Sequence, residues 1–491
     1  MNDYCDVDAT ELARRVRARE VTPHELVDQA IAAIEAVNPK LNAVVHRMYD
    51  AARTETAVDG PFRGVPMVVK DFDGFVRGVP FTASTRFLDG FVPDHDSEAI
   101  ARLRRAGFVF VAKTNCPELA IVGTTEPEWR GPTRNPWNTD HSTGGSSGGS
   151  AALVASRSVP LGHGGDGGGS LRIPASACGL VGLKATRGRI PVGPDMGEGW
   201  GGYVQWGVVS RSVRDTAAVL DVMAGAMPGD PYGVAPPPQP FAAEVGCDPG
   251  KLRVGFSARS LFGKDTDPEC KRATEATAKL LAELGHHVEE AAPVFDRERL
   301  STAFLTQVAI GVAAEIEDME RWTGRRATAN QFEAATWFMN QVGHTLTGLD
   351  LQHARDAMHE ASRQLADYHR RFDLFLGPTL AHPPVRIGEL GLKSIERFGL
   401  GALRAVPVGR ALRAVLAQLA ATQFETTPNT QLFNQTGQPA ISLPLHHTAA
   451  GLPIGVQLAA PMGDEATLLR VAAQLETARP WIGRRPLVCA A

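Results

Sequence analysis

Hydrophobic and polar residues alternate along the chain with two periods, one typical of helices and one typical of buried strands. Residues 9–37 carry apolar positions at helical spacing and predict two amphipathic helices, the second with Pro23 in its first turn. Residues 64–70 and 108–113 are short apolar runs bounded by glycine or polar residues, which predicts buried strands. Residues 97–106, between these runs, have helical periodicity. The pattern predicts a strand–helix–strand arrangement in an α/β protein.

Three further stretches follow along the chain. Residues 131–170 are rich in glycine and serine but contain apolar islands, so we expect loops around a short helix and a strand. Residues 228–250 hold a cluster of prolines and predict a surface linker. Residues 267–420 are mostly helical in pattern, as expected of a helical insertion over an active site. Residues 439–475 return to strands and close with a helix.

Composition and charge narrow the classes of function. The chain has 491 residues, 43% of them hydrophobic and 21% charged, as in an average soluble globular protein. Its 50 basic and 54 acidic residues are spread along the chain without a basic stripe, so we expect no nucleic-acid partner. The chain has neither a secretory leader nor an apolar run of membrane-spanning length, so we expect no membrane and a cytoplasmic location. Its six cysteines form no CxxC pair, which fits reduced thiols and no metal.

Two glycine-rich loops, residues 144–150 and 162–170, are the strongest candidates for chemistry. Runs of glycine let several backbone N–H groups point at one position, which suits a phosphate or the oxyanion of a tetrahedral intermediate. A phosphate-binding loop has one near match, residues 107–114, but its middle residues are apolar and expected to be buried in a strand. Acyl transfer is therefore the favoured chemistry.

Several side chains compete for the roles that acyl transfer requires. Ser146 lies in a G-x-S-x-G pattern, but a nucleophile elbow should directly follow a strand, and residues 135–141 are not expected to form one. An α/β-hydrolase with Ser146 as nucleophile therefore stays a minor alternative. His163 is close enough to Ser170 in sequence to suggest a base, although a structural role is the better interpretation.

The order and spacing of several motifs resemble the amidase signature family. The loop GGSSGGSA at residues 144–151 is followed by DGGGSLRIPA at residues 166–175, so that Ser146 and Ser170 lie 24 positions apart. A lysine segment, GVPMVVKD, precedes both at residues 64–71. Further matching segments extend over nearly the whole chain, at residues 112–115, 131–137, 179–184 and 437–444.

This resemblance implies a fold and a triad. The fold is a mixed central β-sheet covered by helices on both faces, in a single domain over residues 1–491. Its core is expected at about residues 9–228 and 420–480, with a helical, substrate-capping region at about 267–420. The triad is Ser-cisSer-Lys, with Ser170 as the acylated nucleophile, Ser146 after a cis peptide bond as proton relay, and Lys70 as base. An ordinary lysine is a cation at neutral pH, but burial at the end of an apolar strand favours the neutral amine that a base requires.

The resemblance also assigns supporting roles. Backbone N–H groups in the second loop are expected to form the oxyanion hole. Asp166 and Arg172 are expected to hold that loop by hydrogen bonds, and Ser147 to cap the next helix or support the first loop. One departure is that Gly165 precedes Asp166, where the family often has threonine or serine. The predicted oxyanion donors are Gly167, Gly168 and Gly169, together with Ser170, and the predicted substrate-binding residues are Ala120 and Ile121.

The substrate is expected to be a small molecule. Residues 163–166, 188–190 and 478–486 look like the 6-aminohexanoate-cyclic-dimer hydrolase branch, which has aryl-acylamidase and urethanase relatives. This predicts hydrolysis of small, aryl or cyclic amides or of carbamates without a cofactor, and the small apolar character of Ala120 and Ile121 favours an uncharged substrate. The alternative is the A subunit of a tRNA-dependent amidotransferase, which releases ammonia from glutamine within a complex. A homodimer is left open.

Overall fold

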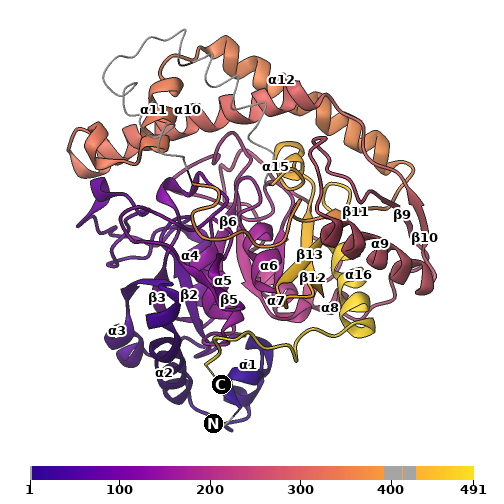
Figure 1. Ribbon diagram of the computed structural model, residues 1–491. Coiled ribbons are helices and arrows are strands. Elements are labelled where there is room, and N and C mark those ends of the chain that lie inside the picture. Colours follow the sequence, from indigo (N-terminus) through magenta and orange to yellow (C-terminus); the bar gives the residue numbers. More distant parts are fainter. Residues whose placement is uncertain (1–2, 392–411, 413–426, 491) are drawn as a thin grey trace.

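The computed structural model describes residues 3–391, 412 and 427–490, and its centre is one mixed sheet of 11 strands (Figure 1). A separate hairpin is formed by β4 (Arg134–Asn135) and β5 (Asn138–Ser142). In spatial order the strands of the central sheet are β1 (Val44–Arg47), β3 (Val109–Thr114), β2 (Pro66–Lys70), β6 (Leu161–Asp166), β8 (Gln205–Ser210), β7 (Val181–Lys184), β12 (Ala440–His447), β13 (Pro453–Ala459), β11 (Leu374–Pro378), β9 (Arg253–Phe256) and β10 (His287–Glu290).

The direction of the strands decides where a site can form. β2 is parallel to both of its neighbours, β3 and β6, while β6, β8, β7 and β12 pair antiparallel in turn. Every residue of β2, β3, β6, β7 and β8 is buried, so both faces of this part of the sheet are covered. The predicted α/β class with a mixed, covered sheet is confirmed, and the carboxyl ends of β2, β3 and β6 lie at one edge.

Helices cover the sheet, and their starts follow local sequence signals. Thr22 caps α2 and forms a capping box with Glu25, with Pro23 in the first turn as predicted. Against the sheet, α5 contacts β6, and α6 contacts β12 and β13. The helices are α1 (Ala9–Arg17), α2 (Pro23–Leu41), α3 (Tyr49–Thr54), α4 (Glu98–Arg105), α5 (Gly148–Ala155), α6 (Arg172–Cys178), α7 (Val213–Met223), α8 (Phe241–Glu244), α9 (Pro268–Glu283), α10 (Arg297–Thr323), α11 (Ala334–Gly343), α12 (Gly348–His369), α15 (Gln431–Thr436) and α16 (Glu465–Ala478).

The helices α11 and α12 both pack on α10, and the three form a layer along one side of the molecule (Figure 1). By length and composition α10 could cross a membrane, but 67% of its most apolar window is buried inside the protein. A core helix of a soluble protein has the same character, so α10 is weak evidence for a membrane span. Its apolar side chains instead join the second hydrophobic cluster of the molecule.

The structure narrows the helical region expected at residues 267–420. β11 is the strand that the sequence predicts at residues 374–376, and β10 is a further strand in that range; both belong to the central sheet, so the helical layer runs from α10 to α12. Residues 392–411 and 413–426 of the expected region lie outside the described residues. The predicted linker at residues 228–250 contains the short helix α8, whose first residue, Phe241, is buried. This segment therefore packs partly onto the core instead of only linking two halves.

Candidate active site

The three residues of the expected triad come from elements that meet at one edge of the sheet. Lys70 is the last residue of β2, and Ser170 lies just beyond Asp166, the last residue of β6. Because β2 and β6 are adjacent and parallel, their carboxyl ends lie side by side, where α/β proteins usually bind ligands. Ser146 precedes α5, which packs against β6. The fold thus brings Lys70, Ser146 and Ser170 to one place.

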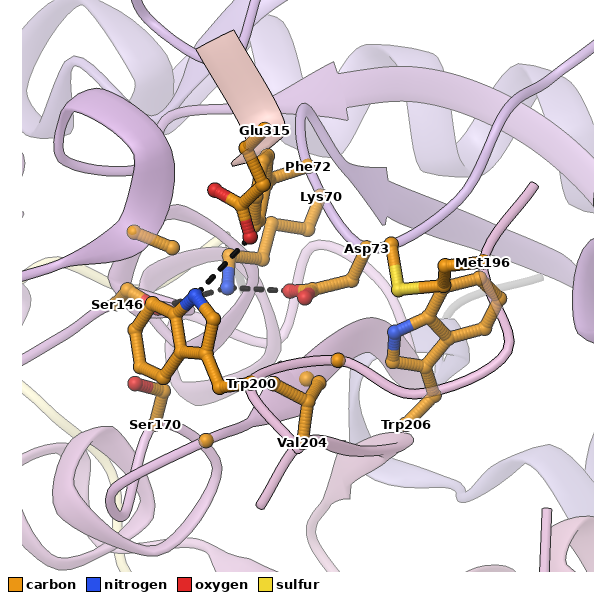
Figure 2. A pocket seen from close by; sticks show the side chains of 14 residues that line it. Lys70, Phe72, Asp73, Ser146, Ser170, Met196, Trp200, Val204, Trp206 and Glu315 are labelled. Atoms are coloured by element: carbon orange, nitrogen blue, oxygen red, sulfur yellow. Dashed lines mark hydrogen bonds and ion pairs between the residues drawn. The ribbon is translucent and has the colours of Figure 1, made fainter. Parts of the chain in front are cut away.

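Lys70 and Ser146 already form half of the expected proton relay. The Lys70 Nζ lies 2.7 Å from Ser146 Oγ, and both side chains are almost completely buried. The peptide bond between Gly145 and Ser146 is cis, as the resemblance implies. Figure 2 shows the Lys70 amine between the Ser146 hydroxyl and the Asp73 carboxylate. A proton can therefore pass between Ser146 and Lys70 without rearrangement of either side chain.

Ser170 lines the same narrow cavity as Lys70 and Ser146 and is half-buried (Figure 2). The Ser147 N–H donates to the Ser170 carbonyl over 3.2 Å and so ties the two glycine-rich loops together. Among the described residues the Ser170 hydroxyl has no hydrogen-bond partner, so the step from Ser170 to Ser146 is the part of the relay that this structure leaves unformed. The Ser170 hydroxyl is thus free to meet a substrate.

A buried ion pair fixes the loop that carries Ser170. Arg172 and Asp166 are both completely buried, and two guanidinium nitrogens of Arg172 donate to the two Asp166 oxygens over 2.8 and 2.9 Å. Asn434 donates to the same carboxylate over 2.8 Å. Burial alone would raise the pKa of Asp166, but Arg172 and Asn434 hold it at about 2. Asp166 is therefore an anion at neutral pH, in the supporting role predicted for it.

The hydrogen bonds of this loop change the expected oxyanion hole. The Gly169 N–H donates to Asp166 Oδ1 over 2.8 Å, so it is occupied and we no longer count it among the oxyanion donors. The turn requires glycine at position 169, because a φ of 125° favours glycine and a Cβ there would lie 2.4 Å from the Thr430 hydroxyl. The N–H groups of Gly167 and Gly168 have no acceptor within the described part of the chain, and they stay the predicted donors.

The other serine and histidine candidates have structural surroundings. The Ser147 hydroxyl donates to the Gly165 carbonyl over 3.3 Å and makes no capping bond to α5, so it supports the loop. His163 is completely buried within β6, and burial, with Lys70 and Lys113 nearby, lowers its pKa to about 3. An imidazole of that pKa is too weak a base for chemistry at neutral pH. The structural interpretation of His163 therefore holds.

Asp73 is a member of the site that the sequence did not reveal. Its buried carboxylate lies 2.5 Å from Lys70 Nζ, at a residue whose φ of 62° is left-handed. Gly165 makes room for it, since a Cβ on Gly165 would lie 2.4 Å from the Asp73 carboxyl carbon. The departure from the family pattern at Gly165 was thus the signal in the sequence. It also adds a partner to the expected environment of Lys70, whose buried Nζ contacts the Asp73 carboxylate as well as the Ser146 hydroxyl.

We predict that Asp73→Asn lowers kcat/KM for amide hydrolysis by about tenfold or more, because the variant removes the carboxylate that holds Lys70 Nζ in place. The measurement is kcat/KM for one amide, with Asp59→Asn as the control, because that variant changes an exposed carboxylate (96% exposed). An unchanged kcat/KM in Asp73→Asn would show that Asp73 does not position Lys70.

The cavity wall contains both expected and unexpected residues. Ala120 lines the cavity, whereas Ile121 is half-buried beside it and does not line it. Trp200 and Glu315 also line the cavity, and the Trp200 indole N–H donates to Glu315 over 3.0 Å (Figure 2). Neither was predicted, because Glu315 belongs to α10, far from the motifs in sequence. In the described residues no group of three His, Cys, Asp or Glu side chains could hold a metal ion.

Known proteins resemble this chain over almost its whole length. A family model described as Amidase matches residues 25–469. The chain is 41% identical over 488 residues to the 6-aminohexanoate-cyclic-dimer hydrolase of Pseudomonas sp. (strain NK87), covering 98% of this chain and 96% of that protein. A solved 6-aminohexanoate cyclic dimer hydrolase, also known complexed with substrate, matches with a TM-score of 0.88 and 39% identity over 99% of both chains. A bacterial aryl acylamidase of the amidase signature family matches with a TM-score of 0.84 and 26% identity, over 98% of this chain and 99% of its own.

Proposed function

The chain belongs to the amidase signature family, and we propose that it hydrolyses compact amides, cyclic amides among them, through an acyl-enzyme on Ser170. Membership makes it an amidase, a hydrolase of C–N bonds other than peptide bonds. The choice of cyclic amides rests on the full-length similarity to a cyclic-dimer hydrolase. The narrow cavity, with Phe72, Trp200 and Trp206 in its wall, supports a compact substrate.

One observation carries the proposed mechanism: Lys70 Nζ lies 2.7 Å from Ser146 Oγ in a cavity that Ser170 also lines. A serine hydroxyl is a weak nucleophile until a neighbouring base accepts its proton. Ser146 is completely buried and bonded to Lys70, so it suits a relay better than a direct attack. Ser170 is the more accessible of the two hydroxyls and suits the attack.

The reaction then follows from these positions. Ser170 Oγ attacks the amide carbonyl as its proton passes to Ser146, while the Ser146 proton passes to neutral Lys70. The N–H groups of Gly167 and Gly168 stabilise the negative charge on the carbonyl oxygen. Lys70 returns a proton through Ser146 to the leaving nitrogen, the C–N bond breaks, and an ester on Ser170 is left. Water, activated through the same relay, hydrolyses this ester to the carboxylic acid.

A hydrolysis screen of the purified chain tests this function. The panel contains cyclic amides, short aliphatic amides, anilides, carbamates, peptide amides and glutamine, with release of the amine or ammonia followed by mass spectrometry. We expect cyclic and short aliphatic amides to be hydrolysed at least about 100-fold faster than glutamine, a selectivity that pocket contacts can supply. A preference for glutamine would favour the amidotransferase alternative, and turnover of carbamates alone would contradict the amide assignment.

We also propose a cytoplasmic location. All six cysteines lie within the described residues and are free, which fits a reducing compartment.

Light scattering of the purified chain would distinguish a monomer from the homodimer left open above.

A further inference from the structure

Glu315 brings a carboxyl group into the substrate cavity from the helical layer. It lines the cavity together with Lys70, Ser146 and Ser170, although it comes from α10 (Figure 2). Gly311, four residues earlier, faces the same way, and a Cβ on Gly311 would lie 2.4 Å from Trp200 Cδ1. The Trp200 ring therefore lies directly on α10 at Gly311. Its indole N–H reaches Glu315 one turn further along the helix.

The two oxygens of Glu315 have different surroundings. Oε1 accepts the hydrogen bond from Trp200 Nε1 over 3.0 Å. Oε2 is buried and has no partner within the described part of the chain. A buried carboxyl oxygen without a partner is unfavourable, and one that borders a substrate cavity is satisfied when a ligand donates to it. The Trp200 bond also holds the carboxyl in place, so Oε2 offers a fixed acceptor.

The charge of the cavity indicates which donor fits. The charged side chains that line it, among the described residues, are Lys70, Asp73 and Glu315. Lys70 and Asp73 form an ion pair at 2.5 Å, so the Glu315 carboxylate has no cation of its own. Burial raises the pKa of Glu315 to about 8; the hydrogen bond from Trp200 opposes this rise, and the negative charge of Asp73 adds to it. A cationic ligand would compensate this carboxylate, whereas an anionic ligand would be repelled.

We propose that Glu315 binds an ammonium group carried by the substrate, at a distance from the amide that Ser170 attacks. The enzyme then favours amides with a terminal amine, and Glu315 determines this specificity. When a cyclic amide is opened, the freed amine stays covalently connected to the acyl group on Ser170 and could attack the ester. The same carboxylate binds this amine and keeps it away from the ester. The inference rests on the proposed function, because it concerns the substrate of that site. It departs from the expectation of an uncharged substrate, which rested on Ala120 and Ile121 and not on Glu315.

The test compares pairs of amides that differ only at the far end. Each pair has an ω-amino amide and its methyl-terminated counterpart, such as 6-aminohexanamide and heptanamide, in a series of chain lengths. For the wild-type chain we expect kcat/KM to favour the amino member at least tenfold at one chain length. Glu315→Gln keeps the size of the side chain and an acceptor for Trp200, and it should reduce this ratio at least tenfold, mainly through KM of the amino member. A ratio that is the same in both proteins would overturn the proposal.

A control variant and a binding measurement separate this inference from the proposed function. Glu317→Gln changes a carboxylate of the same helix whose side chain is 58% exposed, and it should leave the ratio unchanged.

Calorimetry compares the binding of hexylamine with the binding of hexan-1-ol. It requires no amide hydrolysis, so it still tests the inference if the function proposed above is wrong. We expect hexylamine to bind wild type about tenfold more tightly at pH 9 than at pH 7, because below pH 8 a proton competes for Glu315. Binding that is equally tight in Glu315→Gln would contradict the inference.

Discussion

Replacing Ser170 with alanine is expected to lower kcat for amide hydrolysis by about 10⁴-fold or more, the scale seen when a catalytic nucleophile is removed. The neighbouring serines are not free to replace it. The Ser146 hydroxyl is bonded to Lys70, and the Ser147 hydroxyl is bonded to the Gly165 carbonyl. The Ser150 hydroxyl donates to the His163 carbonyl over 2.8 Å. Steady-state hydrolysis of an amide identified in the screen, followed at saturating substrate, gives the result.

The matched control for this variant is Ser147→Ala, which removes a hydroxyl from the adjoining loop. Its hydrogen bond of 3.3 Å is long, so we expect a loss of roughly 1 kcal/mol in the free energy of unfolding and activity within about tenfold of wild type. If Ser170→Ala kept activity within tenfold of wild type, Ser170 could not be the nucleophile. If Ser147→Ala were as damaging as Ser170→Ala, the loops would matter mainly for folding.

Lys70→Met is expected to lower kcat/KM by about 10³-fold, because it removes the only base in contact with Ser146 among the described residues. The substitution also leaves the buried Asp73 carboxylate without its cation, which costs stability. The control must therefore remove a buried lysine from outside the relay. Lys113 is such a residue: it is completely buried in β3, next to β2, and its Nζ lies 3.4 Å from Asp71.

Lys113→Met should thus destabilise the protein about as much as Lys70→Met while retaining far more activity. Thermal unfolding measures the first quantity, and kcat/KM at the optimal pH of each variant measures the second. Equal losses of activity in the two variants would mean that Lys70 acts only through the stability of the site. A near-normal rate in Lys70→Met would remove it from the mechanism.

That Lys70, Ser146 and Ser170 lie together could be predicted from the sequence, because each residue is marked by its own neighbours. Lys70 follows an apolar run, and Ser146 and Ser170 lie in glycine-rich loops at a set spacing. The elements around them, among them β2 and α5, depend on local patterns of apolar residues and formed as expected. Short strands such as β9 and β10, with four residues each, carry too little pattern to be found in this way.

The rest of the site depends on contacts between distant segments. Asp73 contacts Lys70 and has a left-handed backbone conformation, which the local sequence does not predict. Glu315 lies on α10, and only tertiary packing decides which of its faces meets the cavity. The Gly169 N–H was expected in the oxyanion hole, but the Asp166 carboxylate accepts its hydrogen bond in this structure. The composition of a glycine-rich loop does not reveal such a competition.

Gly165 shows how a departure from a family pattern can be informative. In the sequence it was only a glycine at a position where the family often has threonine or serine. In the structure its missing side chain leaves the space that the Asp73 carboxylate fills beside Lys70. A pairing of glycine at this position with aspartate three residues after the lysine is therefore a pattern to look for in related sequences.

Labelling with a fluorophosphonate tests the identity of the nucleophile most directly. The reagent phosphonylates the serine that attacks, and mass spectrometry of the digested protein locates the adduct. Ser146 and Ser170 are separated by Arg157, so trypsin places them in different peptides. We predict one adduct, on Ser170, that is lost in Ser170→Ala and much slower to form in Lys70→Met. An adduct on Ser146 in the wild-type protein, or undiminished labelling of Ser170→Ala, would contradict the account.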